Sequence, residues 1–482
     1  MMTSTTKRFD TYEQWRANAL ARDAATGMQR WVEQESSSLF DYNVIRARLE
    51  ELADIRESGD ANALLFYMNE GFHGNMSGMG SPRLYQKTAL GGTKRLITNY
   101  IDEMVGALDQ LQHVPNSDID LIEKYRFFRR AADCFGRSAL MLSGAGSLGP
   151  FHVGVVKALS EHGLVPNVMS GASAGSVVTA LVGTQKQADL ARAEAWTLLM
   201  ENFTDVQPVP SRRTMRQDDV RGMLEAMIPD WTFEEAFEET GMQINISVAP
   251  TKLNQRARLL NVVQSPNAYI REAVLASCAV PGVFQPVTLM AKTQSGERKP
   301  YIGSRKWMDG SVTHDLPARR LARLYGVNHF IASQANPAVL WALQDPNATD
   351  LPTQLASVWQ SALRDWSKAV YPFAMNVVRD VYPANMLTRM WFSLLSQEYT
   401  ADINISLGQR LFDPTRLLSP LTEREAASLV SEGENATWPK VEMIRNCTAV
   451  SRKIDEALRD IGREVSATYG HDVAQHTTSL SN

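Results

Sequence analysis

The sequence predicts an α/β fold, in which a mostly parallel sheet is wrapped by helices and flanked by helical N- and C-terminal regions. Between residues 138 and 337, short apolar segments typical of buried strands alternate with longer segments in which apolar residues recur at helical spacing. On both sides of this stretch the patterns are mostly helical. We therefore expect a helical N-terminal domain at 1–137, an α/β domain at 138–337 and a mostly helical region at 338–482.

The N-terminal region carries the patterns of amphipathic helices. Apolar residues recur at helical spacing in 44–55, and Gly59 ends that pattern. A break rich in Gly and Met, at 71–92, precedes a second amphipathic helix at 93–111. The boundary with the next domain is expected near residues 133–137.

Within the α/β region the expected elements follow one another closely. Strands are expected at 138–143, 165–170, 243–249, 258–263 and 328–333. Helices are expected at 150–162, 176–184, 268–278 and 317–325, and the first of them has Pro150 in its first turn.

The composition is that of a soluble globular protein, with 44% hydrophobic and 21% charged residues. A net charge of −4 and the absence of a Lys/Arg block argue against a nucleic-acid partner. The three cysteines, Cys134, Cys278 and Cys447, fit no zinc or disulfide pattern, which favours a reducing compartment. Because we find no apolar leader and no run of 18 apolar residues, we expect a cytoplasmic protein without a signal peptide or transmembrane helix.

A motif of small residues follows the expected strand at 165–170. It consists of Gly171, Ala172, Ser173, Ala174 and Gly175, and an apolar segment that fits a buried helix comes next. G-x-S-x-G between a strand and a helix is typical of a nucleophile elbow, in which the serine hydroxyl projects at the head of the helix. The positive end of that helix favours negative charge nearby. The motif is short, so a catalytic Ser173 depends on its surroundings.

A glycine-rich loop follows the first expected strand. Gly144, Ala145 and Gly146 open the sequence GAGSLG, and we favour an oxyanion hole, in which backbone N–H groups donate to a tetrahedral oxyanion. The same letters match the G-x-G-x-x-G of dinucleotide-binding folds. That fold needs an acidic residue after the second strand, where Ser170 and the elbow stand instead. A simple tight turn is the third interpretation.

The elbow serine needs a base, and the sequence offers a carboxylate and histidines. Asp309 precedes Gly310 and Ser311, and a carboxylate can accept the serine proton if its surroundings raise its pKa. His314 and His329 follow Asp309, so the order of a Ser–Asp–His triad is formally present. His314 lies at an expected helix start and His329 inside an apolar strand pattern, so the residues favour Asp309 and leave a triad open.

GAGSLG, GASAG and DGS, in this order and spacing, resemble the patatin-like phospholipase family. The resemblance implies a three-layer α/β/α core and a Ser–Asp dyad that needs no histidine, metal or organic cofactor. It assigns Ser173 as nucleophile, Asp309 as general base, and the backbones of Gly144, Ala145 and Gly146 as the oxyanion hole. Residues 276–281 with Phe284 resemble a further block of the family that lines its site, although core packing explains them equally well.

The flanking segments point to one branch of this family, and two residues differ from the usual family motifs. Segments at 12–23, 39–42 and 78–85 resemble the extra N-terminal domain of the patatin-like triacylglycerol lipases. Ala145 stands where the family usually has the middle glycine of its loop, and Ser311 replaces a smaller residue after Asp-Gly. Neither change removes a catalytic atom.

We therefore expect a serine hydrolase that cleaves fatty-acyl esters of lipids, either a triacylglycerol lipase or a phospholipase-type enzyme. The alternatives are a triad esterase, a nucleotide-binding oxidoreductase that uses GAGSLG, and a lipid-binding protein with a vestigial site. Residues 355–395 combine Trp and Tyr with Lys and Arg, which suits either peripheral contact with a membrane or lipid droplet or helix packing on the core. The sequence indicates no oligomeric state.

Overall fold

The computed structural model describes residues 8–70, 75–186, 216–251, 255–303, 305–311, 315–336, 401–408 and 421–469. The chain divides into two compact units, one made of residues 1–138, 325–329 and 438–482 and the other of residues 139–324 and 330–437. This division differs from the three consecutive segments that the sequence indicates. The long helix near the C-terminus groups with the N-terminal helices, because it packs against two of them.

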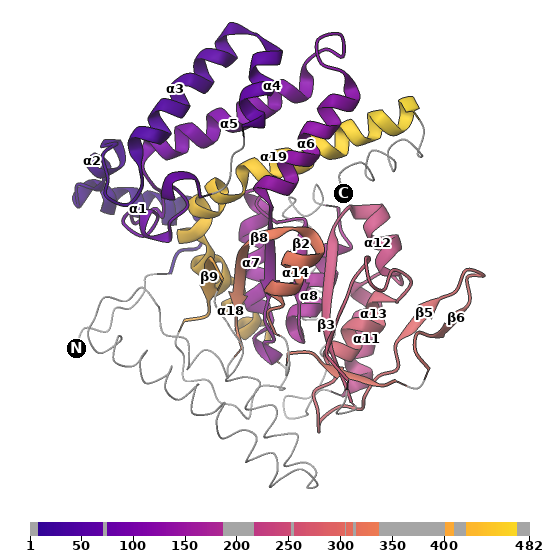
Figure 1. Ribbon diagram of the computed structural model, residues 1–482. Helices are drawn as coiled ribbons and strands as arrows, with labels where there is room; N and C mark the ends of the chain where they lie inside the picture. Colours follow the sequence, from indigo (N-terminus) through magenta and orange to yellow (C-terminus); the bar gives the residue numbers. More distant parts are fainter. Residues whose placement is uncertain are drawn as a thin grey trace, which may run out of the picture. The chain divides into compact units, whose positions relative to one another are not determined.

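The first unit is helical. Its described helices are α1 (Tyr12–Ala25), α2 (Met28–Glu33), α3 (Tyr42–Ser58), α4 (Ala61–Asn69), α5 (Arg95–His113), α6 (Leu121–Phe135) and α19 (Val441–Tyr469). Asp41, Asp60 and Asp120 cap α3, α4 and α6 by accepting bonds from the first backbone N–H groups. The apolar stripe of α5 is buried, and α5 packs against α3 and α19 (Figure 1). Gly59 ends α3, as its sequence predicts.

The second unit is built around a sheet. In the described residues this sheet has seven strands, in the order β4-β3-β2-β1-β8-β9 with β7 also beside β3. The strands are β1 (Arg137–Leu142), β2 (Val168–Gly171), β3 (Gln243–Pro250), β4 (Arg258–Leu260), β7 (Trp307–Asp309), β8 (Val327–Gln334) and β9 (Ile403–Ser406). β1 pairs with β2, β2 with β3 and β8 with β9 in parallel, whereas β3 pairs antiparallel with β4 and β7. The predicted α/β fold with a mostly parallel sheet is confirmed.

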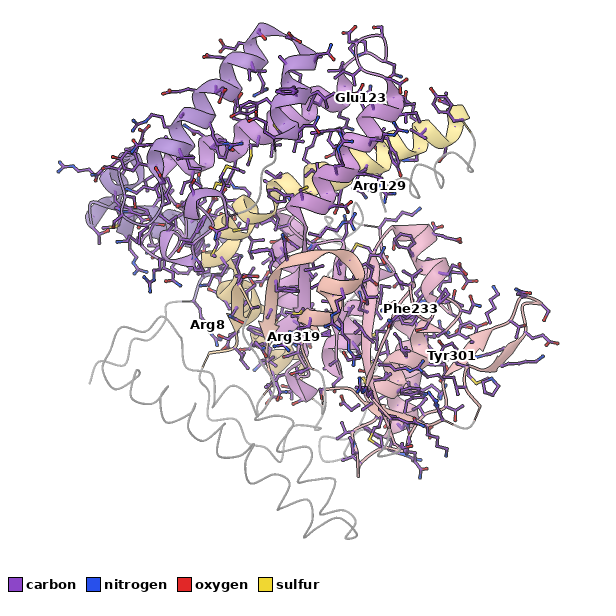
Figure 2. The ribbon with its side chains drawn as sticks, in the orientation of Figure 1. Arg8, Glu123, Arg129, Phe233, Tyr301 and Arg319 are labelled. Carbon is purple, nitrogen blue, oxygen red and sulfur yellow. The ribbon has the colours of Figure 1, made fainter. Side chains whose placement is uncertain are left out.

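The second unit also contains helices. The described ones are α7 (Pro150–Glu161), α8 (Ala174–Gly183), α11 (Gln217–Met227), α12 (Phe233–Thr240), α13 (Ile270–Ser277), α14 (Ala318–Tyr325) and α18 (Glu423–Thr437). Of these helices, α8, α12, α13 and α18 contact strands of the sheet. A separate hairpin consists of β5 (Met290–Lys292) and β6 (Arg298–Pro300). Phe233, at the start of α12, is buried, whereas Glu123 on α6 is exposed (Figure 2). Among the described helices, we find none with both the length and the apolar character needed to span a membrane.

The backbones of α7 and α18 touch through glycine. A Cβ placed on Gly154 of α7 would stand 1.9 Å from the carbonyl oxygen of Val430 on α18. A Cβ on Gly433 of α18 would stand 2.2 Å from the carbonyl oxygen of Phe151 on α7. No side chain fits between the two helices at these positions, so the contact fixes α7, which begins directly after the glycine-rich loop.

Gly154→Ala should therefore destabilise the protein, because the new methyl group meets a carbonyl and neither helix can yield without breaking backbone contacts. We expect the free energy of unfolding to fall by about 2 kcal/mol or more in urea titrations followed by circular dichroism. Gly222→Ala on α11 is the matched control, since a Cβ there meets nothing within 4 Å. It should raise the free energy of unfolding by about 0.5–1 kcal/mol. Similar effects of the two substitutions would contradict the close helix contact.

Candidate active site

Ser173 stands at a sharp turn between β2 and α8. Its φ of +50° and ψ of −127° lie outside the regions that L residues usually adopt. Gly175 permits this turn, because a Cβ there would stand 2.4 Å from the carbonyl oxygen of Leu142 in β1. The strand, turn and helix that a nucleophile elbow requires are therefore all present around Ser173.

β7 brings Asp309 to the same end of the sheet. Val248 of β3 pairs with Arg258 of β4 on one edge and with Asp309 of β7 on the other. β2 runs along that second edge beside the preceding residues of β3, and it ends at Gly171. β7 thus continues the ladder where β2 stops, so Asp309 lies just beyond the carboxyl end of β2, where the elbow turns.

The Ser173 side chain lies next to the Asp309 carboxyl group and lowers its pKa by hydrogen bonding. Both residues are buried, with exposed fractions of 8% and 3%. Burial raises the pKa of Asp309 to about 6, although hydrogen bonds from Ser311 and Ser173 act in the opposite direction. The Ser311 N–H donates to Asp309 Oδ1 at 2.8 Å. A carboxyl group with this pKa is ionised at neutral pH and more basic than an ordinary aspartate, so it can accept a serine proton.

The segment that ends α13 holds both residues. Ser277 Oγ accepts the backbone N–H of Ser173 at 3.0 Å, and the carbonyl of Ala279 accepts the backbone N–H of Asp309 at 3.0 Å. The block at 276–281 thus contacts the site, as one of its two interpretations proposed. Cys278 lies in the same block, and burial raises the pKa of its thiol to about 12. Its sulfur therefore stays protonated and is a poor nucleophile.

The glycine-rich loop touches both other motifs. A Cβ on Gly144 would stand 2.8 Å from the Cβ of Ser311, and a Cβ on Gly149 would stand 3.2 Å from the Cβ of Ala174 in the elbow. Gly310 approaches the backbone of β3 equally closely, with the Ser247 carbonyl oxygen 2.2 Å from where its Cβ would be. Three stretches that are distant in the sequence, around residues 144, 173 and 309, therefore converge at one point.

The three N–H groups expected to form an oxyanion hole are not equivalent. The N–H of Gly144 donates to Asp315 Oδ1 at 2.6 Å, so it is already engaged. The N–H groups of Ala145 and Gly146 have no acceptor among the described residues. The expectation for Gly144 is therefore revised: its backbone anchors the loop, and the two N–H groups that follow are the candidate donors.

Asp315 is a site residue that the sequence analysis missed. Its side chain is fully buried, Oδ1 accepts from Gly144, and Oδ2 accepts from Nδ2 of Asn336 at 3.0 Å. Burial, with a smaller contribution from the charge of Asp309, raises the pKa of Asp315 to about 7, although the hydrogen bonds from Asn336 and Gly144 act in the opposite direction. In the sequence, Asp315 looks like a residue at a helix start. The only available signal was an acidic residue placed shortly after the DGS motif.

Two of the described histidines, His329 and His152, have partners other than Ser173 and Asp309. His329 Nδ1 lies 3.1 Å from Ser138 Oγ near the amino end of β1, whereas Ser173 follows the carboxyl end of the parallel strand β2. His152 is buried between Ser143, whose carbonyl lies 2.9 Å from Nε2, and Ser333, whose Oγ lies 2.7 Å from Nδ1. Burial lowers the pKa of His152 to about 4, so it is neutral. His314 and the aromatic and basic segment at 355–395 lie outside the described residues.

Comparisons with known proteins show which family this chain resembles. Residues 140–322 match the family described as patatin-like phospholipase, and residues 2–133 match a domain of unknown function, DUF3336. The chain is 31% identical to a patatin-like phospholipase domain-containing protein of Cryptococcus neoformans, covering 98% of this chain and 56% of that one. It is also 31% identical to triacylglycerol lipase 4 of Saccharomyces cerevisiae, covering 93% and 52%, respectively. Triacylglycerol lipase ptl3 of Schizosaccharomyces pombe is 30% identical, with 91% of this chain and 93% of that one covered. The chain thus spans about half the length of the first two relatives and nearly all of the third.

The backbone conformation of Ser173 should cost stability, and glycine should relieve that cost. Strain of this kind is worth about 1–3 kcal/mol, while glycine loses about 1 kcal/mol through the unfolded chain. We therefore expect Ser173→Gly to be more stable than Ser173→Ala by about 1 kcal/mol in chemical denaturation. Alanine is the matched control, because it removes the same hydroxyl and keeps the strain. A glycine variant no more stable than the alanine variant would show that the turn is not strained.

Proposed function

The chain belongs to the patatin-like phospholipase family, and on this premise we propose that it is a serine hydrolase that cleaves fatty-acyl esters of lipids with Ser173 and Asp309. The observation that supports the proposal is that these two buried side chains lie next to each other at the carboxyl end of β2. The nearby N–H groups of Ala145 and Gly146 supply what a bare Ser–Asp pair would lack, which is stabilisation of an oxyanion.

The reaction follows from the positions of these groups. Asp309 takes the hydroxyl proton as Ser173 Oγ attacks the ester carbonyl, and the N–H groups of Ala145 and Gly146 donate to the resulting oxyanion. The tetrahedral intermediate collapses, the carbon–oxygen bond to the alcohol breaks, and Asp309 returns its proton to the leaving oxygen. Water then attacks the acyl-Ser173 ester while Asp309 accepts its proton. The second tetrahedral intermediate collapses, the bond between the acyl carbon and Ser173 Oγ breaks, and Asp309 returns the proton to Oγ as the fatty acid leaves.

Asp315 has a positioning role in this scheme. By holding the N–H of Gly144, it sets the direction of the loop that carries the next two N–H groups. The same contact disfavours the alternative of a dinucleotide site. An acidic side chain accepts the first N–H of the loop, at the place where such a fold would offer that donor to a pyrophosphate.

The named relatives favour neutral lipids within the proposed substrate class. Two of them, from two yeasts, are called triacylglycerol lipases, and a third is called a patatin-like phospholipase domain-containing protein. We propose triacylglycerol as the first substrate to assay and phospholipid as the second, with docking at a membrane or lipid-droplet surface.

Ser173→Ala and Asp309→Asn should each lower turnover by on the order of a thousandfold or more, because each removes one half of the proton-transfer pair. Hydrolysis of a short p-nitrophenyl ester and of emulsified triacylglycerol would measure this loss, with circular dichroism to verify folding. His329→Ala is the control and should retain most activity, since His329 contacts Ser138 instead. Full activity of Ser173→Ala would refute the mechanism. A loss of activity in His329→Ala as large as that in Asp309→Asn would favour the Ser–Asp–His triad instead.

The pKa of Asp309 gives the reaction and the fold opposite pH dependences. Only ionised Asp309 can act as base, so log kcat/KM should rise with pH below about 6 and level off above it. The pKa of Asp309 is raised from 3.8 to about 6 because the folded protein favours its protonated form. The stability that this protonated form gives the fold is lost as the pH rises through 6. At pH 8, Asp309→Asn should therefore have a higher free energy of unfolding than the wild type, by at most about 3 kcal/mol. This difference in free energy should become smaller as the pH falls below 6. A variant less stable than the wild type at pH 8 would contradict this assignment.

A further inference from the structure

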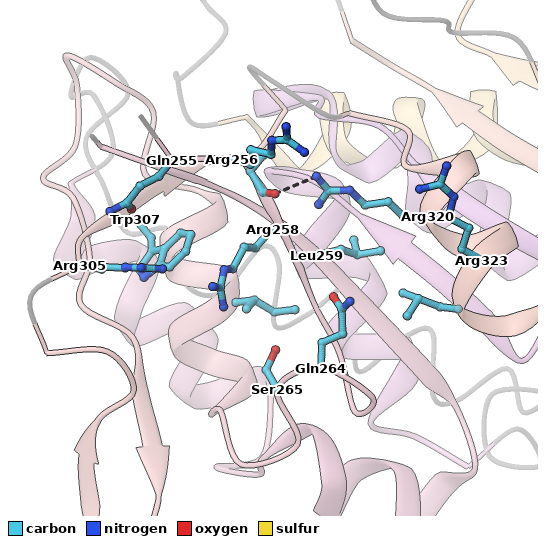
Figure 3. A pocket seen from close by; sticks show the side chains of 13 residues that line it. Gln255, Arg256, Arg258, Leu259, Gln264, Ser265, Arg305, Trp307, Arg320 and Arg323 are labelled. Carbon is cyan, nitrogen blue, oxygen red and sulfur yellow. Dashed lines mark hydrogen bonds between the residues drawn. The ribbon is translucent and has the colours of Figure 1, made fainter. Parts of the chain in front are cut away.

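A pocket of about 810 Å³ lies at the β4 edge of the sheet, apart from the candidate active site. Its walls come from β4 and the residues on both sides of it, from Arg305 and the first residue of β7, and from α14 (Figure 3). Neither Ser173, nor Asp309, nor any residue of the glycine-rich loop lines it. The pocket is therefore a second site, and the ester chemistry leaves it unexplained.

The lining of this pocket is strongly basic. Arg256, Arg258, Arg305, Arg320 and Arg323 all line it, and no Asp or Glu is among its lining residues. None of these five arginines forms an ion pair with an acidic residue in the part of the chain that the structure describes. Other arginines of the same unit are paired: Arg298 with Asp230 and Glu272, and Arg221 with Glu272.

The fold holds some of these guanidinium groups in place. Arg320 Nη2 donates to the carbonyl of Ala257 at 2.8 Å, and its side chain is half-buried (Figure 3). The guanidinium of Arg258 lies 5.8 Å from the centroid of the Trp307 ring, which is itself buried. Gathering like charges is unfavourable unless counter-charge compensates them, so a cluster fixed by its own fold indicates an anionic ligand.

We propose that this arginine pocket binds a small ligand with several phosphate groups, whose oxygens accept hydrogen bonds from Arg256, Arg258 and Arg323. Guanidinium forks match phosphate oxygens in bidentate geometry, and Gln264 and Ser265 add neutral polar groups to the wall. The volume exceeds what one inorganic phosphate needs and falls in the range of small-molecule sites. Five positive charges also exceed the charge of a single phosphate group, which favours a polyphosphorylated molecule or headgroup.

The test uses the full chain and two probes with the same phosphate chemistry. Inositol hexakisphosphate, titrated by calorimetry, represents a soluble ligand. Phosphatidylcholine vesicles with and without phosphatidylinositol bisphosphate, analysed by co-sedimentation, represent a lipid headgroup. Binding of the first alone indicates a soluble phosphate ester, and binding of the vesicles alone indicates a headgroup. Absence of binding to both overturns the proposal.

Two triple variants with the same change in net charge separate the pocket from general electrostatic attraction. Arg256→Gln/Arg258→Gln/Arg323→Gln removes three pocket charges, and Arg16→Gln/Arg126→Gln/Arg424→Gln removes three exposed charges that do not line the pocket. We expect the pocket variant to bind at least about tenfold more weakly and the control to change little. Equal losses in both variants would overturn the proposal. Hydrolysis of a short soluble ester should be unchanged in the pocket variant, which verifies folding. Arg323→Gln alone serves as the second variant if the triple does not fold, and unchanged affinity in it would count against the pocket.

Discussion

The candidate site depends on one costly interaction, which is the burial of a carboxylate beside a serine hydroxyl. An ionised group away from water is tolerated only when donors surround it, and Asp309 receives them from Ser311 and Ser173. Those donors come from the residues after β7 and from the elbow after β2, so the carboxylate ties the two segments together. Burial nevertheless raises the pKa of this carboxyl group to about 6, and in the proposed mechanism this lets it accept the serine proton.

A second buried carboxylate extends the same principle to the third segment. Asp315 accepts from Gly144 after β1 and from Asn336 after β8, and thereby holds the ends of two further strands at the site. His152 acts nearby as a neutral bridge between Ser143 and Ser333. Since a carbonyl can only accept, Nε2 of His152 carries the proton, and Nδ1 accepts from the Ser333 hydroxyl. Buried polar groups, each with its partners, thus fix the loop that carries the proposed oxyanion donors.

Sequence patterns predicted the strands and turns that are determined by residues close together in the sequence. The strands at β1, β2, β3 and β8 and the turn at Ser173 follow from apolar runs and small residues that lie next to one another in the sequence. β7 could not be predicted in this way, because it has only three residues and exists through its pairing with β3. The bond between Gly144 and Asp315 joins residues 171 positions apart, and no local pattern reports whether a loop N–H is already engaged. The sequence therefore located the loop but could not say which of its donors are free.

β3 connects the two sites that we propose. Its residue Val248 pairs with Arg258 of the arginine pocket on one edge and with Asp309 of the candidate active site on the other. Trp307 lines the pocket and belongs to the same short strand as Asp309. A ligand that orders Trp307 and Arg258 would therefore stabilise the two ladders that position Asp309. If binding of such a ligand favours one arrangement of Asp309, then that arrangement must favour ligand binding by the same free energy. The two sites are separate in their chemistry but share one strand as their support.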